Sequence, residues 1–172
     1  HQDRILRDGH TKKNLRREYY DKLYKILKKY EKVFNKKIIV CLHPKNNISK
    51  KRGDFKDLKC IKFKTEKYIS EAFIIFFHEG SSIIQGIVQK KKIINLHGKI
   101  LGDYINKRCD IYPNLLKLYR IDLDNIVFES KTNLLKILEK AKKNYYSYIK
   151  KNIVNEPNKS SIIQIINHLN LR

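Results

Sequence analysis

The chain has 172 residues, enough for one domain with a real hydrophobic core but too few for two full domains. Its 39 Lys and Arg against 17 Asp and Glu give a formal net charge of +22, which indicates a phosphate-rich partner such as nucleic acid, an anionic membrane surface or a nucleotide. The three cysteines lack CxxC spacing, which argues against a disulfide framework or a zinc site, and no apolar run reaches the roughly 20 residues of a membrane span.

The first third of the chain follows the order helix, strand, loop, strand. From Lys12 to Phe34 apolar residues recur at three- and four-residue spacing, which predicts an amphipathic helix. A β-branched run predicts a strand over Lys37 to Leu42 that stops at Pro44, because proline cannot donate to a strand ladder. A polar loop leads to a short strand over Cys60 to Phe63. The helical stripe consists of Leu15, Tyr19, Leu23, Ile26, Leu27, Tyr30 and Val33.

The middle of the chain predicts a βαβ unit. A short helix over Thr65 to Ala72, which Thr65 can cap, precedes the uninterrupted apolar strand Phe73 to Phe77. A strand that is apolar on both faces belongs in the middle of a parallel sheet covered by helices. A helix over Ser81 to Gln89 and a strand over Ile93 to Leu96 complete the unit.

The last part is helical with one short strand. We expect a helix near Leu101 to Cys109, a break at Pro113 and a strand at Ile121 to Leu123. A second long helix is predicted over Lys131 to Ile153, and a final isoleucine-rich helix follows over Ser160 to Leu169. In sum, residues 1–172 are expected to form a single α/β domain, a Rossmann-like three-layer sandwich around a central parallel sheet, with its C-terminal helices from about residue 131 onward.

Residues that follow strand ends are the candidates for ligand binding, because ligands of such sheets lie beyond the carboxyl ends of the strands. His43, Pro44 and Lys45 leave the first strand together, where the histidine and the lysine can contact a phosphate. The alternative is a loop with a chance histidine.

The second candidate is the turn after the apolar strand. Gly80 permits a close backbone approach, and Ser81 and Ser82 begin a helix whose unpaired N–H groups favour an anion. An ordinary serine N-cap is the alternative. Glu79 can hold ribose hydroxyls or be a solvated turn residue, and His78 is either a second phosphate contact or a histidine satisfied within the fold.

These segments together resemble a known family. A strand ending in H-P-K, a K-T-E-x-Y-I-x-x-A helix, an apolar strand, H-x-G-S-S-I and a strand opening with K-K-I-I occur between Tyr19 and Leu96. The series resembles the C-terminal half of bacterial surface-carbohydrate glycosyltransferases of GT-B fold, and is similar to capsule and lipooligosaccharide sialyltransferases and polysialyltransferases with their HP and Ser-Ser motifs. It departs from them at Lys91 and Lys92, where related proteins usually have lysine followed by proline.

The resemblance implies that His43 and the backbone at Pro44 meet the phosphate of a CMP- or UDP-linked sugar donor, and that Ser81 and Ser82 bind the same phosphate. It implies no metal and no other cofactor. The catalytic base and the glycan or glycolipid acceptor site are expected in an N-terminal domain that this chain lacks, so the fragment alone is expected to be inactive. The final helix is expected to pack on that domain.

Two alternatives stay open at this stage. The first is a basic nucleic-acid-binding α/β module without catalysis; no helix-turn-helix, RRM, KH or zinc signature supports it, so a nucleic-acid partner is not expected. The second explains the charge by AT-rich codon usage, which enriches Lys, Ile and Asn whatever the function. The transferase is expected in the cytoplasm, with peripheral association at an anionic inner membrane face.

Overall fold

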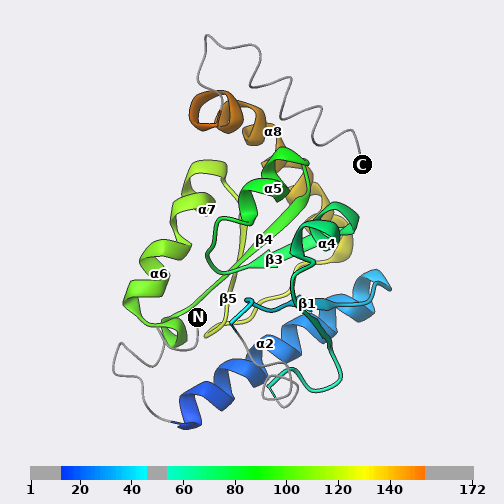
Figure 1. The fold of residues 1–172 in the computed structure, drawn as a ribbon, viewed down its shortest axis with the longest axis vertical. Coiled ribbons are helices and arrows are strands. Elements are labelled where there is room, and N and C mark those ends of the chain that lie inside the picture. Colours follow the sequence, from blue (N-terminus) through cyan, green and yellow to red (C-terminus); the bar gives the residue numbers. More distant parts are fainter. Residues whose placement is uncertain (1–12, 46–53, 154–172) are drawn as a thin grey trace.

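The computed structural model describes residues 13–45 and 54–153 (Figure 1). Their chain alternates helices with short strands, as the sequence predicted. The elements are, in chain order, α2 (Lys13–Phe34), β1 (Ile39–Cys41), β2 (Lys59–Ile61), α4 (Thr65–Glu71), β3 (Ile74–Phe77), α5 (Ile83–Val88), β4 (Lys92–His97), a 3₁₀ turn η1 (Lys99–Leu101), α6 (Asp103–Cys109), α7 (Ile111–Leu116), β5 (Tyr119–Asp122) and α8 (Lys131–Asn152).

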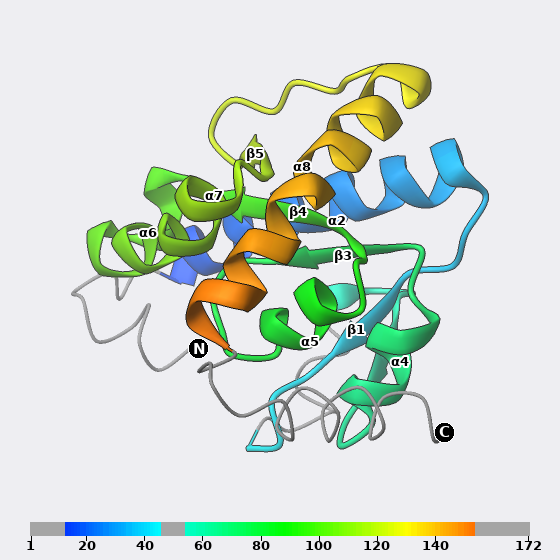
Figure 2. The ribbon, with the colours of Figure 1, turned by 90° about the horizontal axis from the view of Figure 1, so that it is seen from above.

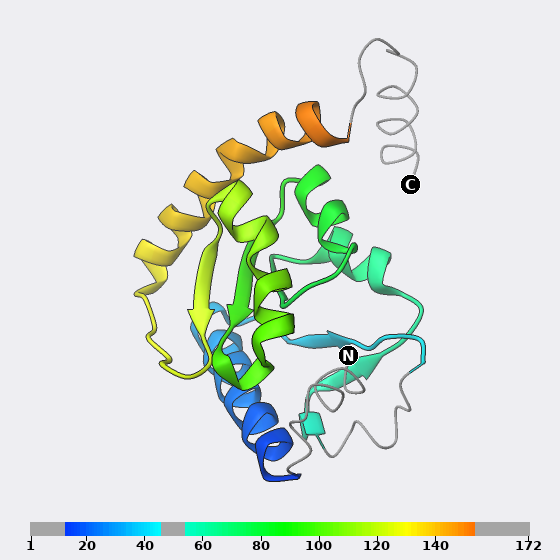
Figure 3. The ribbon, with the colours of Figure 1, turned by 90° about the vertical axis from the view of Figure 1, so that its left-hand side faces the viewer.

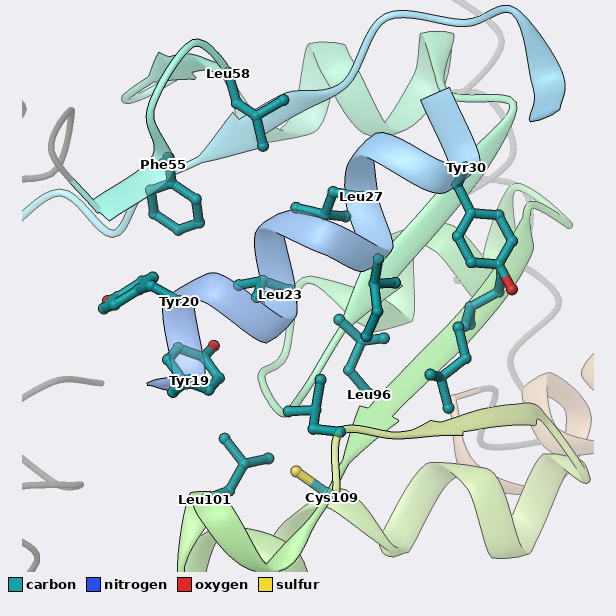
Figure 4. Close-up of a cluster of buried hydrophobic side chains, with 14 of the residues drawn as sticks. Tyr19, Tyr20, Leu23, Leu27, Tyr30, Phe55, Leu58, Leu96, Leu101 and Cys109 are labelled. Carbon is teal, nitrogen blue, oxygen red and sulfur yellow. The ribbon is translucent and has the colours of Figure 1, made fainter. Parts of the chain in front are cut away.

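The long helix α2 packs into the main hydrophobic core along most of its length. The predicted stripe is confirmed: Tyr19, Leu23 and Tyr30 are buried, as are Ile26 and Leu27 between them. Figure 4 shows side chains of this helix between Phe55 and Leu58 on one side and Leu96, Leu101 and Cys109 on the other. The helix is therefore stabilised by apolar burial along one stripe rather than by its polar face.

The strands form two small parallel sheets. β1 pairs with β2, and β3, β4 and β5 form a three-stranded sheet in that order. Figure 2 shows β1 running obliquely to β3 rather than alongside it. The α/β class with parallel strands is thus confirmed, whereas the expected single central sheet is divided in two.

β4 is the central strand of the three-stranded sheet. Ile93, Ile94 and Leu96 in β4 are almost fully buried, because β4 pairs on both edges and is covered on both faces. The expectation that Phe73 to Phe77 lies mid-sheet was wrong: β3 is an edge strand, and its residues are only half-buried. An apolar run predicts burial on both faces but does not fix a strand's place in the order.

The two faces of this sheet are covered by different helices. Ile94 and Leu96 belong to the cluster built on α2, whereas Ile93 packs with the buried residues of α5 and the middle of α8. Figure 3 shows α8 along the upper left of the strands and α2 below them. Gly86 lets α5 approach closely, since a Cβ atom there would lie 2.8 Å from the Ile75 Cδ1 atom.

Several helix boundaries differ from those predicted. Thr65 is the first residue of α4 and not its cap, since the capping position is Lys64. α5 begins at Ile83 instead of Ser81. Pro113 does not interrupt the helix but lies in the first turn of α7. Backbone N–H groups in a first turn have no hydrogen-bond partner within the helix, so the missing N–H group of proline is tolerated there.

α8 confirms the second predicted long helix. Ser130 caps it by accepting a hydrogen bond from the backbone N–H of Asn133 at 3.2 Å. Leu134, Leu138 and Tyr145 form its buried stripe. The predicted final helix, Ser160 to Leu169, lies outside the described residues. Among the helices that are described, none is long and apolar enough to span a bilayer.

Candidate functional site

The carboxyl ends of β1 and β3 lie on the same side of the molecule, on the left in Figures 1 and 2. This is the edge at which parallel α/β sheets bind ligands. The two sequence candidates follow these two strands, so both lie toward one edge of the fold.

An open pocket of about 410 Å³ contains the serine turn after β3. Gly80 has φ +133°, a conformation that favours glycine, and it turns the chain so that Ser81 and Ser82 are exposed at the pocket. Ser82 occupies the N-cap position of α5 in an α-helical conformation and makes no side-chain capping bond. Its hydroxyl is therefore not engaged as an N-cap, the alternative considered for this residue.

The rest of the pocket is formed by the turn after β2 and by two helices. Its lining residues are Phe63, Thr65 and Glu66 from the turn and α4, and Gln85 from α5. Sequence reasoning did not assign a ligand role to any of them. The K-T-E segment that contains Thr65 and Glu66 was nevertheless one of the motifs on which the family resemblance rested, and it lines the same pocket as the Ser-Ser motif.

The segment after β1 adjoins this pocket but does not line it. Desolvation raises the pKa of the Cys41 thiol and the nearby Thr65 hydroxyl lowers it, so the end of β1 lies next to a lining residue. His43, Pro44 and Lys45 continue from there and are exposed. The Nδ1 atom of His43 accepts a hydrogen bond from the backbone N–H of Lys45 at 3.2 Å. Of the two candidates, the pocket includes only the serine turn.

His78 is bonded through both ring nitrogens to the protein itself. Its Nδ1 atom lies 2.9 Å from the Leu96 carbonyl oxygen, so it donates, and its Nε2 atom accepts from the Tyr19 hydroxyl at 2.7 Å. The residue as a whole is only partly buried, but its ring is enclosed, and this burial lowers the imidazole pKa to about 4. These contacts fit the structural alternative for His78, because neither nitrogen is left for a ligand.

Glu79 is directed away from solvent toward α6. Its carboxylate forms an ion pair with the Arg108 guanidinium, and its side chain is only 4% exposed. Arg108 also donates to the Tyr104 hydroxyl at 3.1 Å and lies over that ring. A carboxylate held in this way fixes the strand-end turn, and in the pocket the carboxylate that faces the serines is Glu66.

Asn95 also helps to hold the turn after β3 in place. It lies opposite Phe77 in the ladder and is fully buried. Its Nδ2 atom donates to the backbone carbonyls of Phe77 at 3.4 Å and His78 at 3.1 Å. Together with the contacts of His78 and Glu79, these bonds hold the backbone immediately before Gly80. The serine turn is therefore attached to a fixed support.

The pocket offers hydroxyl donors, a carboxylate and an aromatic ring to a ligand. Thr65, Ser81 and Ser82 can donate to phosphate oxygens, and Glu66 can accept from hydroxyl groups. No three His, Cys, Asp or Glu side chains gather as metal ligands in the part of the chain that the structure describes. The composition of the lining suits a polar, hydroxyl-rich anion.

Comparison with known proteins adds no relative. No protein-family model, no curated protein and no solved structure matches this chain significantly.

Proposed function

We propose that this chain is the donor-binding domain of a glycosyltransferase of GT-B fold, similar to sialyltransferases, that acts in bacterial surface polysaccharide or lipooligosaccharide synthesis. In this proposal the two parallel sheets and their helices are the Rossmann-like donor half of the enzyme. One observation carries the proposal: Thr65 and Glu66 of the K-T-E motif and Ser81 and Ser82 of the Ser-Ser motif line the same pocket.

Each lining group has a part in donor binding under this proposal. The Ser81 and Ser82 hydroxyls donate to the nucleotide phosphate, and the Thr65 hydroxyl of the same pocket adds a third donor. The Glu66 carboxylate accepts from the ribose hydroxyls, the role first considered for Glu79. His43 remains a predicted phosphate contact from the end of β1.

The chemistry that follows is displacement at the anomeric carbon. An acceptor hydroxyl attacks this carbon while the bond to the donor phosphate oxygen breaks, and the electron pair leaves with the phosphate. Fixed hydroxyl donors at Ser81 and Ser82 stabilise the charge that develops there. The base that takes the acceptor proton and the acceptor site are proposed to lie in another domain.

Calorimetric titration of the chain with CMP, UMP and UDP tests the proposal. We expect weak but saturable binding, lowered roughly 10-fold or more in the double variant Ser81→Ala, Ser82→Ala, because two charge-assisted hydrogen bonds are lost. The matched control is Ser147→Ala, an exposed serine on α8, which should bind like the unaltered chain. Equal binding by the double variant, or no nucleotide binding at all, would refute the proposed site.

A further inference from the structure

Phe63 is the most exposed of the large apolar side chains noted on the described surface. It is 77% exposed, and it lines the pocket at the turn between β2 and α4. Its φ angle is +61°, a left-handed conformation that is rare for a bulky residue and costs free energy. A strained backbone and a ring in water are two unfavourable features at one residue.

Neither feature is explained by the fold. The described contacts of the ring consist of the Lys62 amino group, 5.4 Å from its centroid, so it contributes no core packing. Glycine would adopt this backbone conformation without strain, and its lack of a side chain would remove the exposed apolar surface. An exposed aromatic ring on a strained backbone at a pocket fits a ligand-binding role, because strained residues of this kind concentrate at ligand sites.

We propose that Phe63 is the stacking platform for the nucleobase of the bound donor. The inference rests on the proposed function and extends it, since it makes a nucleoside, rather than a sugar phosphate alone, the group that the pocket recognises. The kinds of group that line the pocket fit a nucleotide: the Phe63 ring suits the base, the Glu66 carboxylate the ribose hydroxyls, and the Ser81 and Ser82 hydroxyls the phosphate.

The neighbours of the ring favour a base over the apolar face of a sugar. Stacking on an aromatic side chain is strong and tolerates any base, because every base has a π-face. Gln85 in the same pocket offers an amide donor and an acceptor to a base edge. Lys62 beside the ring adds positive charge next to an anionic ligand.

Two probes and three proteins test this inference by calorimetry at constant ionic strength. The probes are the nucleoside monophosphate that binds best, CMP or UMP, and ribose 5-phosphate, which keeps the ribose and phosphate but lacks the base. The proteins are the unaltered chain, Phe63→Gly and Tyr146→Ala. Tyr146 is a matched control, since it is an exposed aromatic residue, 70% exposed, on α8.

We expect Phe63→Gly to weaken nucleotide binding roughly 5- to 150-fold, the range that corresponds to about 1–3 kcal/mol of stacking. Binding of ribose 5-phosphate should stay within about twofold, and Tyr146→Ala should change neither. The melting temperature of Phe63→Gly should not fall, because glycine relieves the backbone strain. This last result excludes misfolding as the cause of weaker binding.

The outcomes separate the two proposals. If the nucleotide binds and Phe63→Gly leaves its affinity unchanged, the stacking role is wrong while the proposed function stands. If both probes weaken equally, Phe63 shapes the pocket and does not read the base, which also overturns the inference. If no nucleotide binds to the unaltered chain, the proposed function fails and the inference fails with it.

Discussion

The two ring nitrogens of His78 join three elements: α2 through Tyr19, β4 through Leu96, and the turn that leads to the candidate site. A neutral imidazole is required for this arrangement, because Nδ1 donates while Nε2 accepts. Protonation would place a second donor at Nε2 in an enclosed position. The contacts that hold the end of β3 in place therefore depend on His78 staying neutral.

This coupling predicts a pH dependence of stability. Burial lowers the folded-state pKa of His78 from its ordinary value of 6.5 to about 4, so between these values the unfolded chain takes up a proton and the folded chain does not. The free energy of unfolding should thus fall as the pH decreases from 6.5 to 4, by an amount on the order of 2–3 kcal/mol from this group. Urea unfolding at a series of pH values measures the slope.

The variant His78→Gln isolates the contribution. It should lower stability near neutral pH and flatten the slope between pH 4 and 6.5, although His97, whose pKa is also lowered by burial, keeps part of it. The control is Ser147→Ala, an exposed position on α8 without a titratable group, which should keep the slope of the unaltered chain. A slope that survives unchanged in His78→Gln would show that the imidazole is not held neutral.

The end of β1 and the start of α4 lie next to each other, with the Cys41 thiol near the Thr65 hydroxyl. Thr65 is also a pocket residue, so a ligand on Ser81 and Ser82 should shield the neighbouring thiol. Cys41 is exposed, Cys60 is half-buried and Cys109 is buried, and burial raises the pKa of the Cys109 thiol to about 12. The pKa of the Cys41 thiol is raised as well, so access sets the order, and the exposed Cys41 should be the first thiol to react in the folded protein.

This geometry predicts protection of Cys41 by the ligand. Alkylation at mildly alkaline pH, followed by peptide mass spectrometry, should label Cys41 first and severalfold more slowly when the bound nucleotide is saturating. In the double variant Ser81→Ala, Ser82→Ala the protection should disappear at the same nucleotide concentration. If a saturating nucleotide leaves labelling of Cys41 unchanged, the end of β1 lies away from the ligand, and the predicted phosphate contact of His43 is wrong.

The elements that the sequence predicted best are those with a long or strict pattern. α2 and α8 each present many turns of one buried stripe, so their periodicity determined both their type and nearly their ends. The position of β3 at the edge of its sheet could not be obtained in this way, since strand order depends on long-range pairing. Pro113 was misplaced because proline breaks a helix interior but is tolerated in a first turn.

The candidate site was predictable only where a motif carried it. Ser81 and Ser82 were found because a glycine-serine turn follows an apolar strand, and they do line a pocket. Phe63 was not found, because the sequence predicted it as the last residue of a strand, whereas β2 ends at Ile61, and its positive φ angle has no signal in the sequence. Glu79 has a polar strand-end position that suggests a ligand role, but its pairing with Arg108 depends on a helix far along the chain.

The net charge of +22 does not come from the pocket, whose lining residues include no Lys or Arg. Several cations of the described part are ion-paired, such as Arg16 with Asp54 and Lys28 with Asp57. The exposed lysines lie on several helices: Lys25, Lys29 and Lys32 share one face of α2, Lys136, Lys140 and Lys143 share one face of α8, and Lys67 lies on α4. A distributed charge favours non-specific attraction of anions over a shaped nucleic-acid surface.

Salt therefore separates a pocket ligand from a polyanion. If the protein contacts 6–10 phosphates of a generic RNA or DNA, its affinity for that nucleic acid should fall roughly 10³- to 10⁵-fold between about 50 and 200 mM salt. Each phosphate contact releases condensed counterions, and added salt opposes this release. A nucleoside monophosphate held by hydroxyls, a carboxylate and a ring has no such counterion atmosphere, so its affinity should fall by less than about tenfold over the same range. Fluorescence anisotropy of a labelled oligonucleotide and calorimetry of the nucleotide supply the two curves.

The double variant Ser81→Ala, Ser82→Ala provides the internal control, since it should weaken nucleotide binding and leave the salt dependence of oligonucleotide binding unchanged. Tight oligonucleotide binding that persists at 200 mM salt, together with nucleotide binding that the double variant does not change, would instead make this chain a nucleic-acid-binding module.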